Sequence, residues 1–199
     1  DRYRNYNGLE VTLDKRYSDR WMANVSFAYN DAKDYWDSAA AYEDPTNIAQ
    51  SHGAEFAPES GGSGIDNVFT NAKWLVKGSG MYTLPLWDIN LAANMQFRQG
   101  YPFPQAVQTP ARAHQAGPGG GVLDPMGEIR LDNVFTLDLR IDKAFTIGKL
   151  RLVPQMDVFN ATNTNSILAR RRLQTANNAN NISGIVAPRV IRFGVRASW

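Results

Sequence analysis

The 199-residue sequence contains no cysteine, which excludes a disulfide framework and a thiolate metal site. No apolar run approaches the ~18 residues that a transmembrane helix needs. None of the apolar spacing follows the 3.6-residue period of an amphipathic helix. The formal net charge is only +2, so there is no electrostatic reason to expect a nucleic-acid partner.

Motifs for catalysis and cofactor binding are also missing. The sequence has no nucleophile elbow, and the glycine-rich run 117–121 lacks the strand and the Lys-Ser/Thr pair of a phosphate-binding loop. Two histidines, His52 and His114, are too few for a zinc site and are interpreted as surface-loop residues. We therefore expect neither an enzyme nor a bound cofactor.

What the sequence does contain is an alternation of apolar and polar residues with a period of two. At the C-terminus, Ile191, Phe193, Val195, Ala197 and Trp199 alternate with Val190, Arg192, Gly194, Arg196 and Ser198. This period places the two sets on opposite faces of a strand. Similar alternation predicts further strands over 8–14, 21–30, 71–84, 89–98, 135–142 and 150–158. Pro154 cannot donate to a strand ladder, so we expect a bulge or local break there.

The connections between these strands alternate in length. Short turns follow the first, third and fifth strands, whereas long segments cover about 33–67, 101–132 and 163–188. Long structureless loops are uncommon in compact soluble domains, and this asymmetry is typical of outer-membrane barrels. The interpretation places the long loops outside the cell and the C-terminus in the periplasm.

Three features favour lipid over a protein core as the environment of the apolar rows. The polar rows carry charges of both signs, and the apolar stretches have the ~9–11 residues that a tilted membrane strand needs. Aromatic residues collect at the short-turn ends, namely Trp21, Tyr82, Trp87, Phe145 and Trp199. The predicted fold is all-β, an antiparallel up-and-down transmembrane β-barrel. The alternative is a soluble sandwich or a lipocalin-like barrel, with its apolar rows in a core.

The number of predicted strands is odd, whereas bacterial single-chain barrels have even numbers from 8 upward. An open sheet in lipid would leave two unpaired edges, each with costly unsatisfied backbone groups. We therefore expect residues 1–199 to be the C-terminal part of one larger barrel domain.

Several segments resemble the late barrel of TonB-dependent outer-membrane receptors. They are especially similar to the Oar-like receptors that carry a carboxypeptidase-regulatory-like N-terminal domain. The segments are 5–17 with Trp21 and 27–31, Tyr82-Thr-Leu-Pro85, Arg98-Gln-Gly-Tyr-Pro-Phe103, Val158-Phe-Asn-Ala-Thr-Asn163 and Pro188-Arg-Val-Ile-Arg-Phe-Gly-Val-Arg196.

The resemblance implies a plugged barrel of about 22 strands in the bacterial outer membrane, of which this chain supplies about the last seven. It implies uptake of a bulky nutrient such as a siderophore, cobalamin or glycan, driven by the TonB complex acting on an upstream plug. The C-terminal residues resemble the signal read by the barrel-assembly machinery, here Ile191, Phe193, Val195 and Trp199.

On this interpretation the polar rows line the lumen or hold the plug, through Glu10, Asn94, Arg98, Asp138, Arg140, Arg192 and Arg196. The run Arg170-Arg-Arg172 in the last long loop is a possible anion or ligand contact, although such runs are more often simply solvated. The alternatives are a passive porin-like barrel and a surface adhesion or envelope interaction protein. A soluble enzyme is a more distant possibility.

Overall fold

The computed structural model describes residues 2–36, 55–56, 72–103, 105–109, 119–122 and 128–199. In this part of the chain the regular structure is entirely β, and every strand pair is antiparallel. None of the described residues belong to a helix long and apolar enough to cross a membrane. The predicted all-β class with an antiparallel sheet is confirmed.

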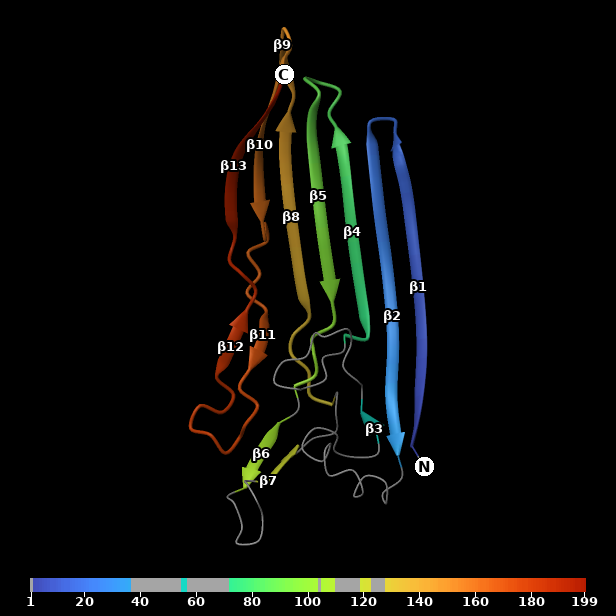
Figure 1. Cartoon of the computed structure of the whole chain (residues 1–199), viewed down its shortest axis with the longest axis vertical. Coiled ribbons are helices and arrows are strands. Elements are labelled where there is room, and N and C mark those ends of the chain that lie inside the picture. Colours follow the sequence, from blue (N-terminus) through green and yellow to red (C-terminus); the bar gives the residue numbers. More distant parts are fainter. Residues whose placement is uncertain (1, 37–54, 57–71, 104, 110–118, 123–127) are drawn as a thin grey trace.

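Seven strands form the main sheet in the order β1-β2-β4-β5-β8-β10-β13. Their bounds are β1 Arg2–Ser18, β2 Trp21–Trp36, β4 Trp74–Thr83, β5 Ile89–Arg98, β8 Val134–Lys143, β10 Leu150–Phe159 and β13 Val190–Ser198. All seven predicted strands are present, although β1 and β2 extend further than the alternation indicated. Strands β1 and β13 form the two borders of the sheet, and each pairs with one other strand among the described residues (Figure 1).

Short turns lie at one end of the sheet, together with the C-terminus, and the long connections lie at the other end with the N-terminus (Figure 1). The β1–β2 turn has only two residues, Asp19 and Arg20, which both adopt positive φ. Such a turn matches the twist of the strands it joins. A second turn, 84–88, joins β4 to β5, and Arg20 Nη1 lies 3.2 Å from Asp88 Oδ1 across the two turns.

The long connections contain short strands of their own. β3 (Glu55–Phe56) pairs with β2, β6 (Ala106–Thr109) pairs with β7 (Gly119–Val122), and β11 (Ile167–Arg170) pairs with β12 (Ile182–Ile185). The alternation in the sequence did not indicate these short strands within the predicted long connections. At the short-turn end, β9 (Phe145–Ile147) forms a hairpin with the start of β10 through Gly148, which has a φ of 62°.

The strand register brings the apolar rows of all seven strands onto one face. Leu13 pairs with Val25, Val25 with Gly78, and Gly78 with Met95, and the same phase continues through Leu137. Because side chains alternate along each strand, every polar row then falls on the opposite face. A slip of one residue in any pair would mix the two faces.

Pro154 produces the predicted local break but no bulge. Between β10 and its neighbours β9 and β8, the pairing stops after Leu152 and resumes in the same register at Gln155. On the other side Pro154 pairs regularly with Val195 of β13. The missing N–H therefore interrupts one ladder without shifting it.

The apolar face has no protein covering it. Along β13, Phe193 is 76% exposed and Val195 68%, and on the far border Leu13 is 69% exposed. Among the described residues only four apolar side chains are buried, namely Phe103, Val134, Val153 and Val186. A soluble domain of this size hides far more of its apolar surface, and contiguous patches of this kind mark contact surfaces.

The connection between β5 and β8 begins with a close backbone contact at Gly100. Its N–H donates to Asn133 Oδ1 (3.2 Å), and its carbonyl accepts a bond from Arg130 Nη1 (3.0 Å). A Cβ at this position would overlap the carbonyl oxygen of Leu131. Only glycine allows the two backbone segments to approach this closely.

We expect Gly100→Ala to lower the free energy of unfolding by about 1–3 kcal/mol, because the added Cβ forces a backbone shift. The measurement is a urea titration of the native protein followed by tryptophan fluorescence. Gly184→Ala is the control, because its nearest contact would be an ordinary 3.6 Å from Ala169 Cβ. Equal stability of the two variants would contradict the close approach.

Candidate functional site on the polar face

The polar face of the sheet is organised in rows that run across the strands. Nearest the short turns, the Tyr17 hydroxyl bonds that of Thr83 (3.1 Å), and Thr83 Oγ1 donates to Asn90 Oδ1 (2.8 Å). Asn90 Nδ2 in turn donates to Asp142 Oδ1 (2.9 Å). This row links β1, across β2, to β4, β5 and β8 through side chains.

The next row contains the shortest ion pairs in the described part of the chain. Asp157 of β10 lies between Arg140 of β8 and Arg192 of β13, because both arginines are its register partners. Arg140 Nε donates to Asp157 Oδ1 at 2.5 Å, and Arg192 Nε and Nη2 donate to Oδ2 at 3.0 and 2.8 Å. We call these three residues the Arg–Asp–Arg cluster.

Asp157 is 3% exposed, whereas the side chains of Arg140 and Arg192 are 43% and 57% exposed. The carboxylate is therefore covered by the two guanidinium groups, which themselves still face solvent. Charge-assisted bonds of this kind are stronger than neutral ones. The cluster ties β8, β10 and β13 together at the border of the sheet.

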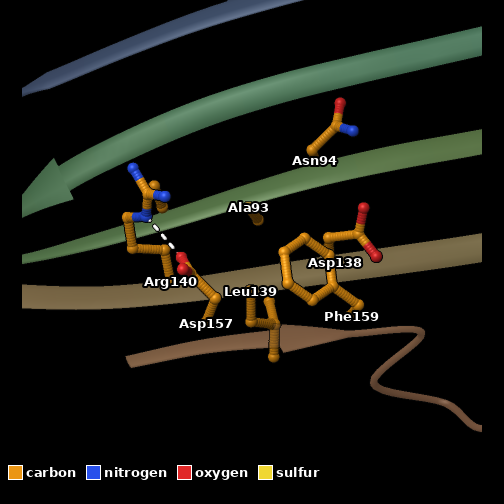
Figure 2. Close-up of a pocket in the computed structure, with 8 residues that line it drawn as sticks. Ala93, Asn94, Asp138, Leu139, Arg140, Asp157 and Phe159 are labelled. Carbon is orange, nitrogen blue, oxygen red and sulfur yellow. Dashed lines mark hydrogen bonds and ion pairs between the residues drawn. The ribbon is translucent and has the colours of Figure 1, made fainter. Parts of the chain in front are cut away.

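A hollow of about 280 Å³ opens on the polar face beside this cluster. Figure 2 shows Asn94, Asp138 and Phe159 at one end of the hollow, and the Arg140–Asp157 pair at the other. Six of its lining residues belong to the polar rows, namely Ala92, Asn94, Asp138, Arg140, Asp157 and Phe159. The other two, Ala93 and Leu139, belong to the apolar rows and lie between these residues along β5 and β8. All of these residues come from β5, β8 and β10, so the rigid sheet positions them.

Where β10 ends, Asn160 holds the hollow's far side in place. It is 5% exposed and has a φ of 47°. Its Nδ2 donates to the carbonyls of Thr164 (2.8 Å) and Ala187 (2.7 Å), and its backbone N–H donates to Asp138 Oδ1 (2.9 Å). Asparagine tolerates the left-handed conformation and here also satisfies buried carbonyl groups.

All seven polar residues predicted to line a lumen lie on this face, but the structure brings only four of them together. Asn94, Asp138 and Arg140 line the hollow, and Arg192 joins them through Asp157. The other three lie elsewhere on the face. Glu10 is on β1 opposite Ala28, Arg196 is opposite Val153, and Arg98 lies 3.9 Å from the Tyr101 ring centroid.

The three consecutive arginines fall on the β11–β12 hairpin. Arg170 Nη1 donates to the carbonyl of Asn180 (3.1 Å), and the backbone of Arg171 is paired with Asn180 and Asn181. Arg171 is exposed, whereas Arg170 and Arg172 are half-buried.

Another arginine, Arg130, lies in the connection between β5 and β8. Burial lowers the pKa of its guanidinium group, and the nearby charge of Asp31 partly offsets this lowering.

The C-terminal residues predicted as an assembly signal all lie on the uncovered face or beyond it. Ile191 is 54% exposed and Trp199 93%. Within the described residues, no group of three His, Cys, Asp or Glu side chains could hold a metal ion. His52 and His114 lie outside the described residues.

Sequence reasoning placed Asp157 on the polar row but missed its central position, and it did not assign Phe159. Both depend on lateral neighbours, which the sequence reveals only once the register of β8, β10 and β13 is known. One feature of the sequence could have indicated the central position of Asp157. Arg140 and Arg192 flank a lone acidic residue on the strand between them, and such residues pair across neighbouring strands.

No protein-family model matches the chain, and no curated protein matches it either. The similarity to TonB-dependent receptors therefore stays a prediction. The function must be argued from the geometry of the two faces.

We expect Asp157→Asn to lower the urea midpoint of unfolding roughly twice as much as Asp142→Asn, because it removes charge-assisted bonds to two arginines. Asp142 is the matched control, since it lies on the same face and accepts one bond, from the neutral Asn90. Both variants keep the side-chain volume. Equal midpoints would mean that the Arg–Asp–Arg cluster does not hold the sheet together.

Proposed function

We propose that this chain forms part of the wall of a bacterial outer-membrane receptor that takes up a bulky nutrient. The observation that carries the proposal is the uncovered apolar face, which stays in phase across seven strands. A lipid bilayer is the environment that such a face fits best. In such barrels strands alternate between apolar residues toward lipid and polar residues toward the interior.

The dimensions of the strands agree with this environment. β4, β5, β8 and β10 each have 10 residues, which is the length that a tilted strand needs to cross the hydrocarbon layer. Covering one large apolar side chain contributes about 1.5–3 kcal/mol, so lipid contact along the whole face would stabilise the sheet strongly. The aromatics at the short-turn end, including Trp21, Tyr82 and Trp87, would lie at the membrane interface.

The two borders of the sheet support a larger assembly. In lipid, each unsatisfied backbone group costs several kcal/mol, so the free edges of β1 and β13 require partners. We infer that further strands pair with both edges and close a barrel of about 22 strands. The long connections then face outside the cell, and the short turns and the C-terminus face the periplasm.

A receptor fits the polar face better than an open pore does. The polar rows carry paired charges and a hollow, which suit contact with a ligand or with a plug domain more than free diffusion of water. The exposed Arg171 in the β11–β12 hairpin at the loop end would be among the first residues to meet the ligand. By resemblance, an upstream plug would couple transport to the TonB complex, and the C-terminal strand would bind the barrel-assembly machinery.

Fractionation of the source cells tests the size and location of the native species, detected with an antibody against the β13 segment. We expect an outer-membrane protein several times heavier than the 22.1 kDa of this chain, with a gel mobility that changes on heating. A species of about 22.1 kDa in the soluble fraction would contradict the proposal.

Uptake measurements test the transport mode. Cells grown on a single scarce nutrient should lose its uptake when the gene is deleted, and equally when a protonophore removes the energy supply. Uptake that depends on the gene but resists the protonophore would indicate a passive barrel. Lost surface attachment with normal uptake would indicate an adhesion protein.

A further inference from the structure

The hollow beside the Arg–Asp–Arg cluster has the size and position of a small-ligand subsite. Its volume of about 280 Å³ lies just below the range of about 300–1,000 Å³ for whole small-molecule sites, which suits one ring-sized group of a larger ligand. Its lining comes from three neighbouring strands, so the binding groups are fixed by the sheet. Sites built on such rigid elements are more precise than sites built on loops.

The charges around the hollow do not favour an anion. Arg140 and Arg192 share Asp157 between them, Asp138 supplies a second carboxylate on the far side, and the charge of Asp142 also acts on Arg140. Two cations and three anions leave no net positive charge to attract an anionic ligand. The electrostatics therefore favour a neutral polar molecule over a phosphate or a carboxylate.

The hollow also contains hydrogen-bond donors and acceptors that are still free to bind a ligand. Asp138 Oδ1 accepts the N–H of Asn160, which leaves Oδ2 available. Asn94 is the register partner of Asp138, and the structure gives its amide no partner among the described residues. Arg140 contacts Asp157 through Nε, so its terminal nitrogens can donate elsewhere.

A carboxylate oxygen, an amide and a guanidinium group in one hollow can both accept and donate hydrogen bonds. Adjacent hydroxyl groups on a ring need this combination, since each hydroxyl donates one bond and accepts others. Asn94 and Asp138 face the same side of the sheet as directly opposed residues, which lie about 4.5–5.5 Å apart at Cβ. That separation suits two neighbouring hydroxyl groups.

Phe159 adds an apolar surface to this otherwise polar row. The residue is 36% exposed, and it lines the hollow next to Asp138 (Figure 2). The guanidinium carbon of Arg192 lies 5.1 Å from the ring centroid, which fixes one side of the ring. Its free surface can pack against the C–H groups of a sugar ring, because aromatic faces carry partial negative charge.

We infer that the hollow binds a sugar ring of a neutral oligosaccharide, with Asn94, Asp138 and Arg140 bonding its hydroxyl groups and Phe159 stacking on it. This inference rests on the proposed function in one respect, because it takes the polar face as the interior of the barrel and the hollow as a part of that face that the plug leaves open to the ligand. It narrows the nutrient to a glycan.

Saturation-transfer NMR on the full-length protein in detergent micelles tests this directly. The probes are neutral oligosaccharides of glucose, mannose, galactose and N-acetylglucosamine, with citrate as the anionic comparison. We expect at least one oligosaccharide to bind through its ring C–H protons and citrate to give no signal. Binding of citrate alone, or of no probe, would overturn the inference.

Variants then locate the site. Asn94→Ala and Phe159→Ala should each weaken binding about tenfold, which corresponds to about 1.4 kcal/mol. Asn90→Ala is the matched control, because Asn90 is the same residue type on the same strand and face but lies outside the hollow. Phe159→Tyr keeps the ring and should restore binding. If Asn90→Ala weakens binding as much as Asn94→Ala, the sugar binds elsewhere.

This experiment separates the inference from the proposed function. The purified protein could bind an oligosaccharide although the cells show no gene-dependent uptake. That result would overturn the proposed transport function and leave the sugar-binding site intact. Gene-dependent uptake of a nutrient without any oligosaccharide binding would overturn the glycan subsite and leave transport intact.

Discussion

The common register of the seven strands is the constraint on which the rest of the structure depends. Each strand alone carries only a weak alternation, and its apolar and polar rows could face either way. Antiparallel pairing in one phase, from Leu13 and Val25 across to Met156 and Phe193, sums these weak patterns into two chemically distinct faces. The turn at Asp19 and Arg20 does not set this phase alone, because the register of β1 and β2 shifts by one residue between Lys15 and Ser18, directly beside the turn.

The two faces then have opposite requirements. The apolar face carries most of the large side chains but buries almost none of them, so its stability depends on what surrounds it. The polar face pairs many of its groups internally, through the row from Tyr17 to Asp142 and through the Arg–Asp–Arg cluster, and leaves others, such as the Asn94 amide, open to a ligand. A sheet that pairs charges on one face and leaves the large apolar side chains of the other face uncovered differs from a sheet of a soluble sandwich, which packs its apolar face into a core. That difference leads to the proposed place in a membrane wall and to the hollow as a site for polar ligands.

Much of the fold could be predicted from sequence, because a period of two is a local property that survives without an alignment. All seven strands, the alternation of short and long connections and the break at Pro154 were visible in this way. The hairpin of β6 and β7 was not, since Gly119, Gly120 and Gly121 are poor strand formers and pair only in their tertiary setting. The candidate site was predicted in part. Asn94, Asp138, Arg140 and Arg192 followed from the polar rows, but Asp157 and Phe159 gain their roles from neighbours on other strands. Closure of the sheet and the family remain predictions.

The central claim is that the uncovered apolar face lies against hydrocarbon, and spin labels on adjacent residues test it most directly. Ala93→Cys and Asn94→Cys place a label on opposite faces of the same strand, at positions that are both exposed. In the full-length protein reconstituted in lipid, the account predicts that the label at residue 93 is relaxed mainly by oxygen, which concentrates in hydrocarbon. The label at residue 94 should instead be relaxed mainly by a water-soluble nickel chelate. Equal access of the chelate to both labels, or shielding of residue 93 from both reagents, would contradict the account.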